Sequence, residues 1–139
     1  MQQVQDLIES IRAAGGRVTP QRIAVIEEIR KSDSHPTIDY LFDKVNVAQP
    51  SLSKKTVYQI VNDLADIGAV SLVDVGTGQL RIDPNVEHSH DHFVCTKCKS
   101  VVDVPTEIKT SISTQIDQYG EINSIDTVYR GICKKCCLA

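Results

Sequence analysis

The feature that most constrains this chain is a duplicated C-x-x-C pair. Cys95 and Cys98 form the first pair, and Cys133 and Cys136 form the second, near the C-terminus. Two thiolate pairs of this kind can close one tetrahedral zinc site. A thioredoxin-like redox motif also uses C-x-x-C, but it needs one reactive pair at the start of a helix. We therefore predict a structural zinc ion on these four cysteines, with Cys137 as a spare thiol.

A second group of metal-binding side chains lies directly upstream of Cys95. His88, His90 and His92 alternate, so in an extended segment they project from one face, with Asp91 on the other. Nitrogen ligands combined with carboxylates suit Fe(II) or Mn(II) better than a site built only of thiolates does, although zinc also binds imidazole. The carboxylate candidates are Asp83, Asp91 and Asp103. The pattern predicts a second metal site, distinct from the zinc site.

Four helices are expected in the first half of the chain. Apolar residues recur there at helical spacing, and each segment has its own start or stop signal. The expected helices run from Val4 to Gly15, from Thr19 to about Lys31, from Pro36 to before Pro50, and from Ser53 to Gly68.

The last of these helices has an informative exposed face. Lys55, Tyr58, Gln59 and Asn62 lie opposite its apolar stripe and offer a cation, hydrogen-bonding groups and a ring. Two short strands, 69–75 and 79–83, then form a hairpin around Gly76-Thr77-Gly78. Helices followed by such a hairpin indicate a winged helix-turn-helix. An ordinary solvated face explains the four side chains equally well, so the helix alone leaves both interpretations open.

A different pattern begins after Pro84-Asn85-Val86. Strands are expected at about 92–94 and 101–104, a helix from Thr106 to Tyr119, and two further strands before Cys133. The predicted fold class is α+β, with a winged-helix domain at 1–83, a hinge at 84–86 and a dimerisation and metal-binding domain at 87–139. The core of the second domain is thin, so zinc and a partner subunit are both expected to stabilise it.

Charge and the N-terminal sequence limit the partners. The net charge of −3 gives no general attraction to nucleic acid, so any DNA contact depends on where single cations are placed. The N-terminus lacks the basic and apolar segments of a secretory signal, and no apolar run is long enough to span a membrane. We expect a cytoplasmic protein without a membrane partner, in which paired cysteines serve as metal ligands and not as disulfides.

Five motifs taken in order carry a resemblance to a known family. They are Thr19-Pro20-Gln21-Arg22, His35-Pro36-Thr37, Thr56-Val57-Tyr58, the segment 90–98 (HDHFVCTKC) and the segment 131–136 (GICKKC). Along nearly the whole chain they resemble the ferric uptake regulator (Fur) family. The resemblance implies a winged helix, a C-terminal dimerisation domain, and a non-enzymatic repressor that binds double-stranded DNA as a metal-loaded homodimer. It places the regulatory metal ligands at His35, Asp83, His90, His92 and Asp103.

The resemblance also indicates what the metal senses. Peroxide regulators of the family (PerR type) carry aspartate at the two carboxylate positions, and this chain has Asp83 and Asp103. It therefore resembles a peroxide sensor, in which iron-catalysed oxidation modifies a ligand histidine, His35 or His90. Ile125 stands where many relatives have a histidine, which argues against a second regulatory metal site.

The expected DNA contacts lie around the fourth helix. We expect the major groove of inverted-repeat operator DNA to be contacted by Lys55, Tyr58 and Gln59. Lys54 and either Arg17 or Arg22 are the candidate phosphate contacts, since phosphate contacts position a domain and base contacts specify the sequence.

Three alternatives remain at this stage. The first is an iron- or manganese-responsive repressor without peroxide sensing. The second is a zinc-stapled interaction module, which explains the cysteines but leaves His35 and the paired aspartates without a role. A metalloenzyme is the third, and it needs a general base; Glu87 is the one such group beside the histidines, and the chain has no H-E-x-x-H motif.

Overall fold

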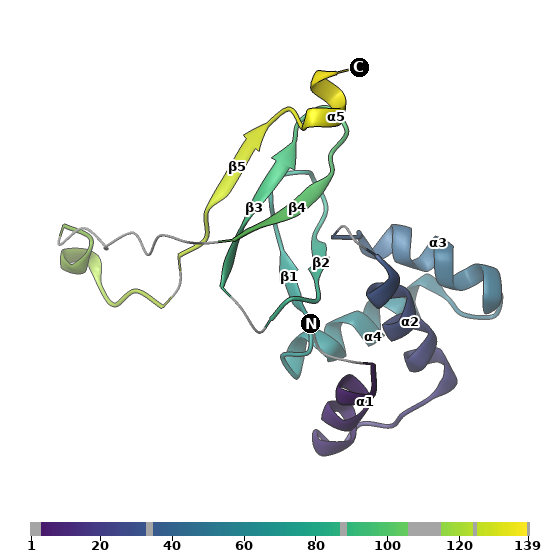
Figure 1. Ribbon diagram of the computed structural model, residues 1–139. Coiled ribbons are helices and arrows are strands. Elements are labelled where there is room, and N and C mark those ends of the chain that lie inside the picture. The colour runs from purple at the N-terminus through teal and green to yellow at the C-terminus, as the bar shows by residue number, and fades with distance from the viewer. Residues whose placement is uncertain (1–3, 33–34, 87–88, 106–114, 124, 139) are drawn as a thin grey trace. The chain divides into compact units, whose positions relative to one another are not determined.

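The computed structural model describes residues 4–32, 35–86, 89–105, 115–123 and 125–138 (Figure 1). The chain divides into two compact units, Met1–His88 and Ser89–Ala139. The first unit contains four helices and a two-stranded hairpin, and the second is built on a three-stranded sheet. Within the described residues, no helix has the length and apolar character that crossing a membrane requires.

The helices of the first unit begin at the predicted signals. They are α1 (Val4–Ala13), α2 (Pro20–Lys31), α3 (Ile38–Ala48) and α4 (Lys54–Asp66). The side-chain oxygens of Thr19, Thr37 and Ser53 each accept a backbone N–H from the first turn of α2, α3 and α4 respectively. Such N-caps satisfy donors that have no partner inside the helix. The three predicted helix starts are therefore confirmed.

One apolar core joins the four helices to the hairpin. Its side chains without exposed surface come from α2, α4 and the second hairpin strand: Val25, Ile26, Val57, Val61 and Ile82. Ile23 lies at helical spacing from the buried residues Ile26 and Ile29 of α2, but it is only half-buried. Because α2 contacts α1, α3 and α4, its buried face is wider than a single stripe and includes Val25.

The hairpin is shorter than predicted. Strand β1 (Ser71–Val73) pairs antiparallel with β2 (Arg81–Asp83), with Ser71 opposite Asp83. Pairing stops after Val73, because the Asp74 carboxylate accepts the backbone N–H of Gly76 at 3.0 Å and closes a local turn. Gly76 and Gly78 adopt φ angles of 81° and 92°, which favour glycine. Together with the helices, this hairpin makes the first unit a winged helix-turn-helix.

The second unit has a mixed sheet with the strand order β4-β3-β5. Strand β3 (His90–Cys95) lies between β4 (Val101–Pro105), which is antiparallel to it, and β5 (Val128–Gly131), which is parallel. A short helix, α5 (Lys134–Cys137), follows β5. The fold class is therefore α+β, as predicted.

The segment between β4 and β5 differs from the prediction where it is described. Residues 106–114 of the expected helix lie outside the described residues, and Asp117–Tyr119 forms a single 3-10 turn, η1, not the end of an α-helix. The expectation of two strands before Cys133 is wrong for the described segments 120–123 and 125–132, which contain β5 alone. Residues 121–123 and 125–127 are exposed and have no ladder partner, which a strand requires.

Candidate functional site

The four cysteines of the duplicated pair gather in the second unit. Their Sγ atoms all lie within 4.8 Å of one another. Cys95 ends β3, Cys98 lies in the following turn, and Cys133 and Cys136 lie at the start and within α5. A tetrahedral zinc ion with Zn–S bonds of about 2.3 Å holds its sulfurs about 3.8 Å apart. The Sγ atoms of Cys98 and Cys133 are 3.9 Å apart, so this set fits zinc.

Sheet pairing brings the two cysteine pairs together. Cys95 is in register with Gly131 across the parallel β3–β5 ladder, so the residues after each strand emerge side by side. The backbone N–H groups of Cys133 and Cys98 both donate to Cys95 Sγ, each at 3.4 Å. These bonds, the one from Cys133 first, lower the pKa of Cys95 to about 6. The thiolate, which is the form that binds metal, is thereby favoured.

The neighbouring thiols have the opposite effect on Cys136. Its hydrogen bond with Cys133, followed by burial, raises the pKa of Cys136 to about 12. One site therefore holds a favoured thiolate and a disfavoured one, and a dication would compensate the charge that full deprotonation creates. Cys137 donates instead to the carbonyl of Ile132 at 3.5 Å and does not belong to the four-sulfur group.

The second unit also holds three nitrogen and oxygen donors. His90 and His92 lie on the same side of β3, with ring centroids 4.8 Å apart. Asp103 is the register partner of His92 on β4. Its Oδ1 lies 3.3 Å from His90 Nε2 and 3.7 Å from His92 Nε2. The predicted alternation is thus realised for these two histidines, whereas His88 and Glu87 lie outside the described residues.

The first unit holds the other two predicted donors. His35 Nε2 lies 3.5 Å from Asp83 Oδ2, and both side chains are buried. Hydrogen bonds tie the segment of His35 to the hairpin strand that ends at Asp83. Arg81 donates a guanidinium N–H to the His35 carbonyl at 3.1 Å, and the Ile82 N–H donates to the Pro36 carbonyl at 2.9 Å. The β1–β2 hairpin therefore holds the backbone segments that carry His35 and Asp83 next to each other.

The exposed side of α4 has the predicted composition. Lys55, Tyr58, Gln59 and Asn62, hereafter the α4 face, are all exposed. The Tyr58 hydroxyl donates to Asp39 Oδ1 at 3.2 Å, and Lys54 Nζ lies 3.5 Å from the same oxygen. Partial burial, and then this hydrogen bond, raises the pKa of Tyr58. The phenol therefore keeps its proton at neutral pH.

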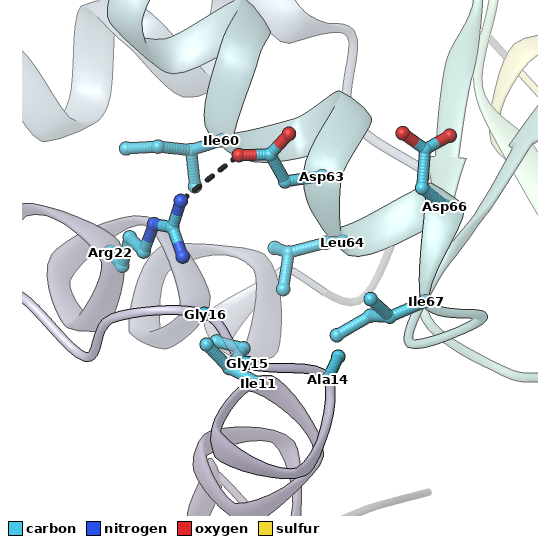
Figure 2. A pocket seen from close by; sticks show the side chains of 10 residues that line it. All are labelled: Ile11, Ala14, Gly15, Gly16, Arg22, Ile60, Asp63, Leu64, Asp66 and Ile67. Atoms are coloured by element: carbon cyan, nitrogen blue, oxygen red, sulfur yellow. Dashed lines mark hydrogen bonds and ion pairs between the residues drawn. The ribbon is translucent and has the colours of Figure 1, made fainter.

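The two arginine candidates for phosphate contact have different surroundings. Arg22 Nη2 lies 3.0 Å from Asp63 Oδ2, a contact drawn in Figure 2. Its Nη1 donates to the Arg17 carbonyl at 3.0 Å. The residue Arg17 itself is exposed. No sequence pattern indicates a role for Asp39 or Asp63, because their partners on other helices are not neighbours in any periodic pattern.

A winged helix-turn-helix, a four-sulfur cluster and imidazole–carboxylate groups in both units define a metal-binding regulator of the winged-helix class. The sequence pattern of the Ferric uptake regulator family matches residues 13–124. The peroxide-responsive repressor PerR of Staphylococcus epidermidis is 31% identical over 137 residues, which cover 96% of this chain and 90% of that protein. The chain therefore belongs to the ferric uptake regulator family of metal-responsive transcriptional repressors.

Solved structures agree with this fold. The peroxide stress regulator of Campylobacter jejuni is 27% identical, with a TM-score of 0.63 over 98% of this chain and 100% of that one. The ferric uptake regulator Fur of Helicobacter pylori has a TM-score of 0.74 at 19% identity, over 98% of this chain and 95% of that one.

Proposed function

We propose that this chain is a peroxide-sensing repressor that binds inverted-repeat operator DNA as a metal-loaded homodimer. The observation that carries the proposal is that the carboxylate beside the candidate histidines is an aspartate in both units, Asp83 beside His35 and Asp103 beside His90 and His92. The relatives named as peroxide-responsive repressors support the same function.

The proposed regulatory site uses both groups of donors. Three imidazoles and two carboxylates suit Fe(II) or Mn(II), and the ligands would be His35, Asp83, His90, His92 and Asp103. A bound cation would compensate the negative charge of the two carboxylates. An ion shared by donors from both units would favour one arrangement of the units over others. It shifts the population only by its differential affinity for that arrangement.

The four cysteines have a structural role in this proposal. Zinc held by Cys95, Cys98, Cys133 and Cys136 would join the end of β3 to α5 and stabilise the small second unit. Because folding and metal binding are coupled in small zinc domains, the zinc also supports the dimer formed by this unit. Exposed apolar side chains in the described part of the unit, including Val102, Tyr129 and Ile132, support the presence of a partner subunit.

Peroxide would act through the ligand histidines. Bound ferrous iron would supply one electron that cleaves the O–O bond of peroxide and releases hydroxide. The histidine that takes up the remaining oxygen atom would return one electron to the iron and lose one proton, so that imidazole and peroxide give oxidised imidazole and water overall. Mn(II) is a much poorer reductant. His35 and His90 are the side chains proposed to take up oxygen. An oxidised imidazole is a weaker ligand, so the metal affinity falls and the DNA is released.

The proposed DNA surface centres on α4. Lys55, Tyr58 and Gln59 would enter the major groove, with Lys54 and Arg17 or Arg22 directed to phosphates. A dimer presents two such helices about one DNA turn, or a multiple of it, apart, and this spacing matches an inverted repeat.

The experiment is to select duplexes from a randomised library with the zinc-loaded protein and then measure gel-shift affinity with and without Mn(II). The proposal predicts an inverted-repeat consensus and binding that depends on Mn(II). Equal binding in both conditions, or no selected sequence, would contradict it.

A further inference from the structure

The carboxylate of Asp63 on α4 contacts two different side chains at the same time. Its Oδ2 lies 3.0 Å from Arg22 Nη2 on α2, and its Oδ1 accepts the Nε2 amide of Gln59 at 2.9 Å. The contact between Asp63 and Arg22 is drawn in Figure 2. Each carboxylate oxygen therefore has its own partner. Gln59 belongs to the exposed α4 face, whereas Arg22 is half-buried and comes from α2.

The contact to Gln59 fixes the direction of its amide. A carboxylate accepts hydrogen bonds and donates none, so the NH₂ group of Gln59 must face Asp63. Its carbonyl oxygen then points away as an acceptor. A glutamine without such a partner presents its oxygen and nitrogen interchangeably. The fixed oxygen of Gln59 selects a donor on the base edge, which in the major groove is the amino group of adenine or cytosine.

The contact to Arg22 fixes the carboxylate in turn. The guanidinium also donates to the Arg17 carbonyl, so it is held from the α1–α2 loop and not only by Asp63. The loop fits tightly around it, since a Cβ on Gly16 would lie 3.0 Å from Arg22 Nη1 and 2.9 Å from Ile11 Cγ2. Arg22 also offsets the negative charge of Asp63, which would otherwise repel nearby phosphates.

We propose that Asp63 is a positioning residue that sets the base specificity of α4 without touching a base. Held by Arg22, it orients Gln59 to recognise adenine or cytosine at one position of each half-site. The inference rests on the proposed function, because it requires the α4 face to lie on DNA.

The test uses the Mn(II)-loaded, zinc-loaded dimer and the duplex selected by the wild-type protein. Each position of one half-site is changed to the other three base pairs, and affinities are measured for wild type, Gln59→Ala and Asp63→Asn. Gln59→Ala identifies the position that Gln59 reads, where wild type should discriminate by about fivefold or more. Asp63→Asn should reduce discrimination at that position to about twofold or less, because an asparagine accepts either amide orientation. The double variant Gln59→Ala/Asp63→Asn should discriminate at that position no less than Gln59→Ala alone.

Asp66→Asn is the matched control. Asp66 is exposed on the same helix and borders the same hollow in Figure 2, so its variant removes one negative charge without breaking the Asp63 contacts. It should change the affinity for all duplexes alike and leave discrimination intact. Arg22→Gln provides a second test, since it should relax the same position, whereas loss of a phosphate contact would weaken all duplexes equally. Zinc content and the melting curve confirm that each variant is folded.

The outcomes separate the two proposals. If Gln59→Ala loses the preference while Asp63→Asn keeps it, the role of Asp63 is refuted and the repressor function stands. The role is also refuted if Gln59→Ala changes no preference. If the wild-type protein selects no sequence, the proposed function fails, and the inference fails with it.

Discussion

His35 Nε2 and Asp83 Oδ2 lie 3.5 Å apart in the first unit, and both side chains are buried. An imidazole and a carboxylate at this separation offer two ligand atoms to one cation. His35→Ala should weaken Mn(II) binding to the zinc-loaded protein by at least about tenfold, since even groups that only support metal ligands contribute about 10- to 100-fold. Isothermal titration with Mn(II) measures the change.

Asp91→Asn is the control for that titration. Asp91 lies between His90 and His92 on β3, and its side chain is expected on the opposite face of the strand. Its variant should bind Mn(II) as the wild type does. If His35→Ala also kept wild-type affinity, His35 would not be a regulatory ligand.

The zinc assignment predicts that Cys95→Ser loses zinc and the dimer together. Cys95 is fully buried and its Sγ accepts two backbone N–H groups, so the change removes a ligand at the centre of the cluster. Metal analysis with native mass spectrometry reports both properties. Cys137→Ser, outside the four-sulfur group, should change neither. A folded, zinc-free dimer of Cys95→Ser would refute the assignment.

Tyr58 gives a direct test of the α4 face. The residue is 41% exposed, and partial burial, followed by the hydrogen bond to Asp39, raises the pKa of its hydroxyl. Tyr58→Ala should weaken operator binding by about thirtyfold, the middle of the range for one good base contact, without altering metal content. Tyr40→Ala removes a tyrosine from α3 that is 50% exposed, and it serves as the control. Unchanged affinity in Tyr58→Ala would mean that the face is merely solvated.

The helical core makes a prediction about stability. Leu64 is 2% exposed and packs against the other helices, so Leu64→Ala should lower the free energy of unfolding by about 2–5 kcal/mol. Val47 is 82% exposed, and Val47→Ala should leave stability nearly unchanged. Urea denaturation of the metal-loaded protein compares them, and equal stability of the two variants would contradict the packing described here.

The sequence predicted local features well because they depend on neighbouring residues. Each N-cap directly precedes the helix that it caps, as for Thr19, Thr37 and Ser53. The spacing within each cysteine pair can likewise be read directly from the sequence. The contacts of Asp63 and Asp39 were not predictable in this way. Arg22 lies 41 residues from Asp63, and Asp39 lies 19 residues from Tyr58, so these bonds depend on how the helices pack and not on any periodicity. The second strand predicted before Cys133, which the described residues 120–123 and 125–132 do not contain, is a wrong prediction of the same kind, because a strand needs a partner that its own sequence does not specify.

Oxidation of a ligand histidine tests the peroxide-sensing claim most directly. The Fe(II)-loaded and Mn(II)-loaded dimers are treated with low peroxide, digested, and analysed by peptide mass spectrometry, with Asp103→Glu as a comparison. Added oxygen is predicted on His35 or His90 in the iron form alone. It should be reduced in Asp103→Glu, whose longer side chain alters the reach and orientation of the carboxylate. If both metal forms stay equally unmodified, peroxide sensing is contradicted, and the chain is an iron- or manganese-responsive repressor instead.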